Sequence, residues 1–399
     1  MAIDTVTLRS PFITEEVAQR IELQSIKRQG VNMKSGELLY SLTTARLKGS
    51  FDARISVKVE RQQKGFDNKI PYKKDCSPFI TLECSVHKAL IGHNVYGGTD
   101  DFRASILWLI DKVNELLGVQ LPPAPLWQVR RIDVAEVFML VSEQAVQEWF
   151  QGLKINDTFR RRSVSKYGQH GLLVVGTTTS LKFYHKGKEF AKHDARRLLP
   201  FTDVIKVAEL QELADRLLRA EVEIKTRKLK EDFGHVPLVS EITIDYLNNL
   251  FDKEVGAFLK EGASRVGKVI TVNAVRQRLV KEYGERRAKT LFNTWHQLAT
   301  LGEQFVKDNQ KPATFYEHVK LIRKAECSWH STDLLLRRTD GLVPEGFSPT
   351  RCDKRRLTGE LPVIQEKLKL YRERSCSENV LLNEENSNEP LVGYFLAPL

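Results

Sequence analysis

The segment spanning residues 176–190, GTTTSLKFYHKGKEF, places a tyrosine between two lysines. If residues 181–186 form a strand, its side chains alternate, so that Lys182, Tyr184 and Lys186 share one face. Two ammonium groups beside a phenol would attract a phosphodiester, favour the phenolate over the phenol, and stabilise charge on the phosphoryl oxygens. A tyrosyl ester retains the energy of the broken phosphodiester, so such a site could both cut and reseal a strand. The alternative is a lysine-rich edge strand that carries an ordinary tyrosine.

Acidic side chains on other expected strands could hold a cation near this tyrosine. Asp133 shares a polar strand face with Arg131, while Glu221 and Glu83 lie on the polar faces of strands of their own. Carboxylate oxygens from separate strands are the ligands that Mg²⁺ or Mn²⁺ would take, and such an ion would polarise the scissile phosphate. Each of these residues could instead be a surface carboxylate in a salt bridge.

Two further acids and one histidine are weaker candidates for the same site. Glu136 falls on the apolar side of its strand unless a bulge intervenes, and Glu223 shares the face of Glu221 as a second choice. His93 lies in a turn between Gly92 and Asn94, where it could ligate a transition ion or hold the loop together by hydrogen bonds.

The elements that must position these residues are mostly strands with one wet face. Apolar and polar residues alternate strictly over 51–60, 80–85 and 219–227, which is typical of an antiparallel sheet. Further strands are expected at 4–13, 128–134 and 171–175, and helices at 15–24, 101–117, 143–153 and 204–216. We therefore predict an α+β catalytic domain, mostly antiparallel sheet with flanking helices, over residues 1–240.

From about residue 241 the period of the apolar residues becomes helical. Thr271 can cap a helix that ends at Gly284, and a second helix is expected over 285–301. Thr314 with Glu317, a capping-box pair, predicts the start of a third helix. We expect these helices to form a smaller domain over 241–342, either a helix-turn-helix-like DNA-binding module or a cap on the sheet.

The last segment, residues 343–399, is expected to be an extension with one helix near 361–374 and a mobile acidic tail. Residues 377–399 contain four Glu and no Lys or Arg. The whole chain carries a formal charge of +11, so the part before residue 377 carries +15. Such an excess fits a polyanionic partner, either nucleic acid or an anionic membrane surface.

Composition also excludes several classes of protein. No apolar run approaches the roughly 18 residues needed to span a bilayer, and the amino terminus lacks the pattern of a secretory signal, so we expect a cytoplasmic protein without a membrane partner. The five cysteines form no C-x-x-C pair, which speaks against a zinc site and a disulfide framework.

Several sequence blocks, taken together, match one family. They are LRSPFI at 8–13, LIGHNVYGGTD at 90–100, RID at 131–133, YHK at 184–186 and RAEVEIKTRKLK at 219–230, with a weaker likeness through 268–334. In order and spacing the chain resembles the replication initiator of filamentous phages, the nicking protein encoded by the phage's second gene. It is more distantly similar to plasmid rolling-circle initiators.

This resemblance implies a nicking and closing endonuclease that starts rolling-circle DNA replication. Tyr184 would become linked to the 5′ end of the nick, and Lys186 would assist it. The plasmid relatives imply Asp133 and Glu221 as ligands of Mg²⁺ or Mn²⁺, and His93 as a further ligand or phosphate contact. Where those relatives often carry a second acid, this chain has Val137, which leaves the set of metal ligands open.

The partners expected from the same reasoning are a double-stranded origin, single-stranded DNA, and the helicase and polymerase of a bacterial host. The protein would act in the host cytoplasm, as a monomer or as a homodimer on DNA. Six basic side chains are candidates for contacts with DNA: Arg131, Lys182, Arg160, Arg161, Arg162 and Arg227.

Two other functions remain open at this point. The chain could be a non-catalytic DNA-binding initiator or repressor, which would bind DNA without cleaving it. It could also be an enzyme like the tyrosine recombinases, in which Arg and His stabilise the transition state without a metal. Their tyrosine normally lies in a helical domain near the end of the chain, whereas Tyr184 lies mid-chain in an expected strand.

Overall fold

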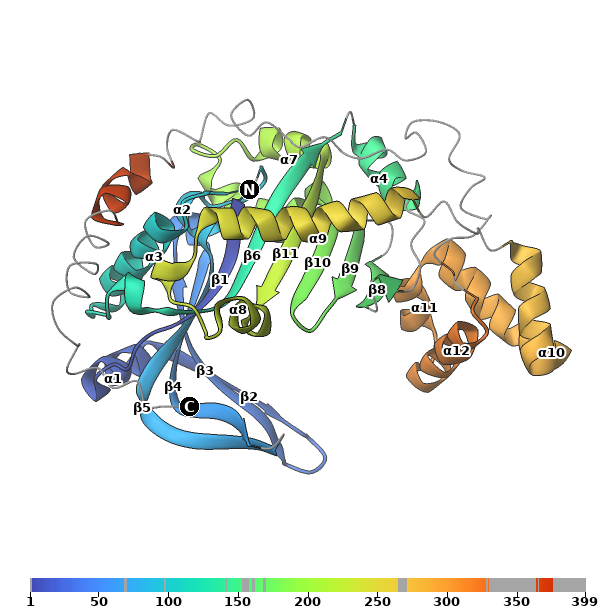
Figure 1. Cartoon of the computed structure of the whole chain (residues 1–399), viewed down its shortest axis with the longest axis horizontal. Helices are drawn as coiled ribbons and strands as arrows, with labels where there is room; N and C mark the ends of the chain where they lie inside the picture. Colours follow the sequence, from blue (N-terminus) through green and yellow to red (C-terminus); the bar gives the residue numbers. More distant parts are fainter. Residues whose placement is uncertain are drawn as a thin grey trace.

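The computed structural model describes residues 2–67, 70–96, 98–140, 142–152, 158–159, 162–167, 170–264, 271–327, 329, 364 and 366–375. Within these ranges, strands pair antiparallel in one 11-stranded sheet of order β2-β3-β4-β5-β1-β6-β11-β10-β9-β8-β7 (Figure 1). The predicted α+β class and the antiparallel sheet are therefore confirmed.

The strands are β1 Ala2–Arg9, β2 Ser25–Val31, β3 Leu38–Lys48, β4 Arg54–Asp67, β5 Ile70–Ser85, β6 Gln128–Met139, β7 Thr158–Phe159, β8 Arg162–Tyr167, β9 Gly171–Val175, β10 Thr179–His185 and β11 Leu217–Lys225. The main helices are α1 Glu15–Leu23, α2 Val86–Ile91, α3 Phe102–Leu117, α4 Glu143–Gly152, α5 Lys186–Phe190, α6 Arg196–Leu198, α7 Val207–Asp215, α8 Thr226–Phe233, α9 Ile244–Ser264, α10 Val272–Leu301, α11 Glu303–Asn309 and α12 Pro312–Lys324.

One face of the sheet carries the main hydrophobic core. In β11, every second residue, such as Val222 and Ile224, points into this core, as the alternation of the sequence predicts. Helix α9 crosses the same face in front of β6, β11 and β10 (Figure 1). Its Phe258 stacks on Phe183 of β10 with ring centroids 4.7 Å apart. The residues between, including Tyr184, therefore lie on the opposite face, which we call the polar face.

A second, smaller core covers one end of the polar face. Val137 of β6, Leu217 of β11 and Phe190 of α5 pack there with Val95 and Tyr96 of the loop after α2. This packing gives a structural reason for Val137, which stands where an acid was expected from plasmid relatives. A carboxylate at this position would be buried among apolar side chains.

Two hairpins extend beyond the part of the sheet that is covered by helices (Figure 1). Strand β2 pairs with β3 along its whole length, but β3 pairs with β4 only from Ala45 to Lys48. Strands β4 and β5 continue past the core as a second ribbon. The alternation at 51–60 and 80–85 predicted parts of β4 and β5, but no sequence pattern predicted β2 or β3.

The helices after residue 241 divide between two cores. Helix α9 packs on the sheet through residues such as Leu247, Phe251 and Phe258, so the expected boundary at residue 240 falls inside one packed unit. Helices α10–α12 have a core of their own, built around Trp295 and Phe315. Helix α9 thus caps the sheet, while α10–α12 pack around a core of their own, and a DNA-binding role for them stays a prediction.

The helix boundaries predicted for this region are only partly right. Thr271 caps α10 by accepting a hydrogen bond from the Ala274 amide at 3.2 Å, as expected. Gly284 interrupts α10 with φ 72° and ψ 161°, a conformation that favours glycine, at the boundary between the two predicted helices. The capping box expected at Thr314 is wrong, because α12 begins at Pro312 and Thr314 lies inside its first turn.

A helix near the carboxyl end packs back on the sheet domain. Residues 366–375 are helical, and Leu368 is buried in the main core. Arg372 donates to Asp101 at 2.8 Å, and Arg374 to Asp111 at 2.5 Å. The helix expected near 361–374 is therefore present, whereas the predicted acidic tail lies outside the described residues.

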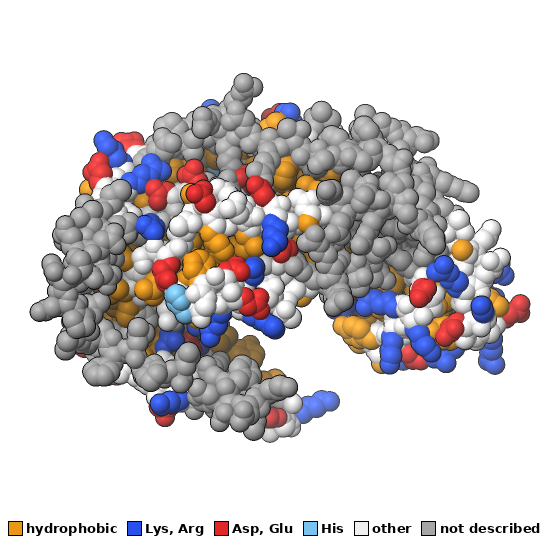
Figure 2. All heavy atoms as spheres, in the orientation of Figure 1, with side chains coloured by type: hydrophobic (Ala, Val, Ile, Leu, Met, Phe, Trp, Pro, Cys, Tyr) orange, Lys and Arg blue, Asp and Glu red, His pale blue; other side chains and the backbone are white. Residues whose placement is uncertain are grey.

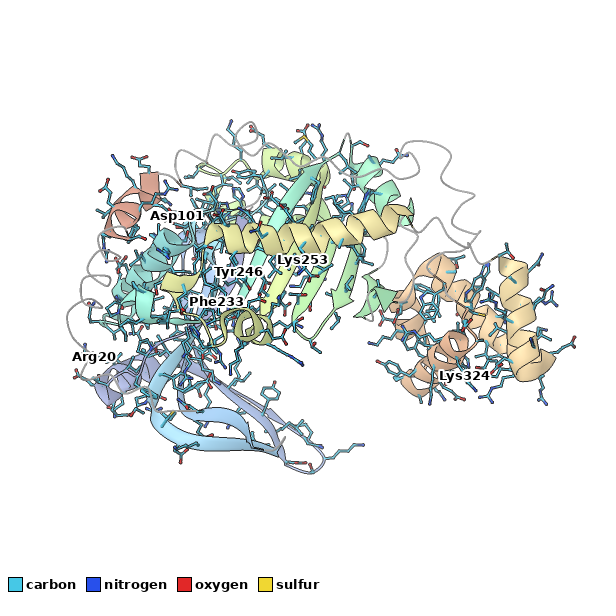
Figure 3. All side chains as sticks on the ribbon, viewed as in Figure 1. Arg20, Asp101, Phe233, Tyr246, Lys253 and Lys324 are labelled. Carbon is cyan, nitrogen blue, oxygen red and sulfur yellow. The ribbon has the colours of Figure 1, made fainter. Side chains whose placement is uncertain are left out.

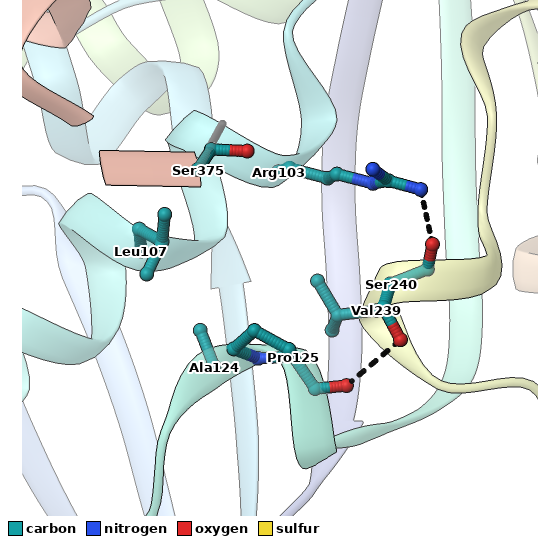
Figure 4. Close-up of a pocket in the computed structure, with 7 residues that line it drawn as sticks. All are labelled: Arg103, Leu107, Ala124, Pro125, Val239, Ser240 and Ser375. Carbon is teal, nitrogen blue, oxygen red and sulfur yellow. Dashed lines mark hydrogen bonds between the residues drawn. The ribbon is translucent and has the colours of Figure 1, made fainter. Parts of the chain in front are cut away.

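A small hollow beside this helix does not take part in the candidate chemistry (Figure 4). It is lined by α3, the turn before β6 and the 3₁₀ turn Val239–Glu241, and Arg103 donates to the carbonyl of Ser240 there. None of its lining residues belongs to β10 or β11. Among the described helices, none is both long enough and apolar enough to cross a membrane.

Candidate active site

The strand pairing brings the chemical groups of three strands together on the polar face. Tyr184 of β10 is directly opposite Arg219 of β11, and Lys182 is opposite Glu221. On the other side of β11, Glu223 is opposite Asp133 of β6. Directly opposed residues in antiparallel strands share a face, so these side chains form one contiguous cluster. We call it the polar-face cluster.

Tyr184 is partly exposed and is held by a carboxylate. Its hydroxyl donates a hydrogen bond to Glu221 Oε1 at 2.5 Å. Burial, together with the negative charges of Glu221, Glu189 and Asp4, raises the pKa of Tyr184 well above its ordinary value, although Arg219 opposes the shift. The expectation that neighbouring lysines favour the phenolate is therefore wrong. The group closest to the hydroxyl is a carboxylate and not an ammonium.

Arg219 fixes the position of that carboxylate. The arginine is fully buried, and its Nε donates to Glu221 Oε1 at 2.9 Å. Its guanidinium also pairs with Asp4 at 3.2 Å and donates to the carbonyl of Asn94 at 2.8 Å. Arg219 thus joins Glu221 to β1 and to the loop after α2. Because the planar guanidinium is held at several points, the carboxylate of Glu221 has little freedom to move.

Lys186 lies beneath the cluster and not on the tyrosine strand. The strand ends at His185, whose Nδ1 caps the next helix by accepting from the Gly187 amide at 3.1 Å, so Lys186 is the first residue of α5. Its side chain is fully buried, donates to Asn94 Oδ1 at 2.7 Å, and pairs with Glu189. The prediction that Lys186 shares the exposed strand face with Tyr184 is therefore wrong.

Asn94 connects Lys186 to the residues beside Tyr184. Its side-chain amide donates to Asp4 Oδ1 at 2.7 Å, and Asp4 in turn pairs with Arg219. Burial lowers the pKa of Lys186, with the nearby Glu189 opposing the shift. A chain of contacts through Asn94, Arg219 and Glu221 thus links Lys186 to Tyr184.

Three carboxylates surround the ammonium of Lys182. The Nζ atom lies 3.4 Å from Asp133 Oδ2, 3.8 Å from Glu221 Oε2 and 3.4 Å from Glu223 Oε2. Asp133 is also bound by Arg131 through two hydrogen bonds of 2.7 and 2.6 Å. Burial is the main cause that raises the pKa of Asp133 to about 6, against the pull of Arg131 and Lys182. A cation, here an ammonium, already occupies the point where these oxygens converge.

These three carboxylates therefore suit a cation, but their present arrangement does not form a metal-binding site. In the ranges that the structure describes, no group of three or more His, Cys, Asp and Glu side chains is arranged to hold a metal ion. Asp133 and Glu221 do converge, as predicted, and Glu223 joins them. Glu83 is exposed on β5, with β1 between it and Asp133, and it pairs across to Thr7 and Ser56. Glu136 has the parity of the apolar face, as predicted.

His93 belongs to the loop beside the cluster. The ring is buried, its Nδ1 accepts from the Val95 amide at 3.4 Å, and it packs edge-on against Tyr96 at 5.2 Å between centroids. These contacts fit the structural role that the sequence left open. The neighbouring Asn94, which no sequence pattern indicated, bonds to the cluster through its carbonyl, which accepts from Arg219, and its side chain bonds to Asp4 and Lys186.

The candidate DNA-binding residues are distributed over different surfaces. Arg131 and Lys182 are both 30% exposed in their side chains and lie on the polar face, where carboxylates engage them. Arg227 is not on β11, which ends at Lys225. It lies on α8, exposed and paired with Glu231. Arg160, Arg161 and the side chain of Arg162 lie outside the described residues.

Three residues of the network were missed as site residues: Asp4, Asn94 and Arg219. Arg219 could have been found from the sequence, because it lies two residues before Glu221 in RAEVEIK and therefore on the same face of the strand. Nothing in the sequence showed that Arg219 would face Tyr184, since β10 and β11 are separated by several short helices.

Comparison with known proteins identifies the family of the chain. Residues 2–245 match the family described as the N-terminal region of the replication-associated protein of phage gene II, a span that includes every residue of the polar-face cluster. A search of curated proteins found no match. Because the match covers more than half of the chain, the protein belongs to the filamentous-phage gene II replication initiator family.

Proposed function

We propose that the protein starts rolling-circle replication by nicking one strand of a double-stranded origin through Tyr184 and that it later rejoins the displaced strand. The observation that supports this most directly is the hydrogen bond that the hydroxyl of the half-buried Tyr184 donates to Glu221 on the polar face. A nucleophile needs a proton acceptor within hydrogen-bond reach, and Glu221 satisfies that requirement.

The nicking step follows from this contact. The Tyr184 oxygen attacks the phosphorus while its proton passes to Glu221 Oε1, the atom that already accepts it. The tyrosyl–phosphorus bond forms and the bond from phosphorus to the 3′ oxygen breaks. That oxygen takes up a proton from solvent and leaves as a 3′-OH. Arg219 is a positioning residue in this scheme, because it holds Oε1 in place.

The closing step is the reverse reaction with a different strand end. A 3′-OH attacks the phosphotyrosine, the tyrosyl–phosphorus bond breaks, and Tyr184 recovers its proton. Between the two steps, the first 3′-OH would prime the host polymerase while a host helicase unwinds the duplex. The protein would therefore be a site-specific DNA endonuclease and strand transferase.

A divalent ion would be held by the oxygens that now surround Lys182. Asp133, Glu221 and Glu223 face that point from two adjacent strands. Mg²⁺ or Mn²⁺ bound there would supply charge neutralisation at a phosphoryl oxygen. Lys182 would have to leave the carboxylates to make room, and its ammonium would then be available to a phosphate oxygen.

The test uses supercoiled plasmid that carries the cognate origin, with Mg²⁺ or with EDTA. We expect nicked circles and a protein–DNA adduct from the wild type, and neither from Tyr184→Phe, which should still bind the origin. Tyr246→Phe is the matched control. Tyr246 lies on α9, on the other side of the sheet, and donates to Asp232 at 2.8 Å (Figure 3). It should nick as the wild type does.

The same experiment separates the other functions. A non-catalytic initiator or repressor would bind the plasmid without nicking it under any metal. A recombinase-like enzyme would nick equally well in EDTA. Nicking by Tyr184→Phe would show that Tyr184 is not the nucleophile.

A further inference from the structure

The hairpin of β2 and β3 projects from the sheet without support. Residues 25–31 pair with 38–45, and only the last part of β3 is joined to the rest of the sheet. Every residue from Leu38 to Leu42 is exposed. At about 3.3 Å per residue, the free part extends roughly 20 Å. We call the segment 25–48 the β2–β3 arm.

The arm combines positive charge with exposed apolar side chains. It contains five basic residues, Lys27, Arg28, Lys34, Arg46 and Lys48, and one acid, Glu37. Its exposed apolar residues include Ile26, Leu39, Tyr40 and Leu42, of which Leu39 is 61% exposed. Figure 2 shows Lys and Arg side chains at the outer end of the lower hairpins. Exposed apolar side chains gathered in this way mark a binding surface.

One side of the arm is continuous with the polar face. Ala45 and Leu47 pack toward the main core, so the alternate residues Arg28, Leu42 and Arg46 face the other way. The strand register runs from Arg46 through Ser56, Glu83 and Thr7 to Arg131 without changing face. Six strand spacings of about 4.8 Å separate β3 from β10, and this row of residues reaches β10 at Thr178, six residues or roughly 20 Å along the strand from Tyr184. The base of the arm therefore lies roughly 35 Å from Tyr184.

Three arginines, Arg28, Arg46 and Arg54, lie near one another at the base of the arm. Partial loss of hydration, with Arg54 and Arg28 nearby, lowers the pKa of Arg46. In the described residues, no carboxylate forms an ion pair with any of these three guanidinium groups. Like charges held together at a surface favour an anion that bridges them.

We propose that the β2–β3 arm binds duplex DNA by lying in one groove, at least roughly 35 Å from Tyr184. A two-stranded ribbon fits the major groove, which is about 12 Å wide. The arginines would contact phosphates at the groove edge, and Tyr40 and Leu42 would contact the bases. The inference rests on the proposed function only in taking an origin duplex as the substrate.

Charge argues against a second copy of the chain as the occupant of the arm. Edge-to-edge pairing of β2 with another β2 would bring Lys27 and Arg28 of both copies together. Like charges across a strand pair are destabilising, and lysine on an edge strand disfavours such pairing.

The test measures binding of the full chain to two fluorescent probes, a mixed-sequence 30-base-pair duplex and single-stranded (dT)30, at several salt concentrations. The arm variant is Arg28→Ala with Arg46→Ala. The control variant, Lys112→Ala with Lys253→Ala, removes the same charge from α3 and α9 on the helix-covered side (Figure 3). Removing one phosphate contact should reduce the slope of log K against log salt by about 0.9.

We expect the slope for the arm variant to fall by about 2 and its duplex affinity to fall at least tenfold, with little change on (dT)30. The control should keep the wild-type slope. Leu42→Ala should weaken duplex binding several-fold without a change in slope, because an apolar contact releases no counterion. An unchanged slope, an equal loss on both probes, or a change of oligomeric state in the arm variant would each overturn the proposal.

These outcomes do not depend on cleavage. If the wild type binds duplex through the arm but never forms an adduct with origin plasmid, the proposed nicking function fails and the arm proposal stands. If the wild type forms the adduct while the arm variant binds duplex as the wild type does, the arm proposal fails and the proposed nicking function stands.

Discussion

The buried contacts of Arg219 allow a quantitative prediction for Arg219→Met. The arginine is fully buried between Asp4 and Glu221, so a neutral side chain of similar length leaves two carboxylates without their main partner. Removing one member of a buried ion pair typically costs about 3–5 kcal/mol of unfolding free energy. We expect a loss of this size at pH 7.5, together with loss of nicking because Glu221 is no longer held.

The pH dependence of that loss follows from Asp4. Burial disfavours the ionised form of Asp4, but in the wild type the positive charges of Arg219 and Lys88 outweigh burial and lower the pKa of Asp4. Its contribution to stability is therefore present above the unfolded-state pKa and is lost as the pH falls through the folded-state pKa. In Arg219→Met, burial is no longer opposed by Arg219, and the ionised carboxylate becomes destabilising. The difference between wild type and variant should shrink as the pH falls from 7.5 toward 4.5.

Urea unfolding followed by far-ultraviolet circular dichroism at both pH values measures this difference. Arg227→Met is the matched control, because the ion pair of Arg227 with Glu231 is exposed and should contribute less than about 1 kcal/mol. Arg219→Lys keeps the charge but not the three-way contact, and should recover part of the stability. A destabilisation below about 1 kcal/mol, or an equal destabilisation at both pH values, would refute the account of a buried network.

Other predictions test separate parts of the chain. Burial lowers the pKa of His185 to about 4, so the stability that its neutral form contributes is present above pH 6.5 and is lost as the pH falls toward 4. His185→Asn can still cap α5. Between pH 6.5 and 4 its unfolding free energy should fall less than that of the wild type, by up to roughly 3 kcal/mol. Leu368→Ala should cost about 2–4 kcal/mol by urea unfolding because Leu368 is buried in the main core, whereas Leu370→Ala should cost less than about 0.5 kcal/mol because Leu370 is 60% exposed. Gly284→Ala should lower the melting temperature, because φ 72° with ψ 161° is strained for alanine, whereas Gly256→Ala inside α9 should leave it unchanged or raise it.

The parts of the fold that the sequence predicted are those with two unlike faces. Strand β11 could be recognised because Val222 and Ile224 enter the core while Glu221 and Glu223 remain on the polar face. The β2–β3 arm was missed for the opposite reason. Both of its sides are exposed, so no alternation of apolar and polar residues is required there.

Some members of the site were predictable from the sequence, but the contacts between them were not. Strand parity brought Tyr184, Asp133 and Glu221 to one face, and the structure confirms that grouping. The alternation of side chains along a strand could not predict the position of Lys186, because the strand ends at His185, which caps a helix. Its partner Asn94 lies 92 residues earlier in the chain, and contacts at such a distance depend on the register of the whole sheet.

The central strands would keep the two proposed tasks of this face, gripping a duplex and cutting one strand, at separate places. Ile3 and Val6 of β1 and Ile132 and Val134 of β6 are fully buried, and these strands lie between the arm and the tyrosine. A close-packed core resists deformation, so the separation of the β2–β3 arm from Tyr184 is set by the sheet and not by a linker. If the arm holds a groove, the phosphate that reaches Tyr184 is then chosen by its distance along the DNA as well as by its sequence.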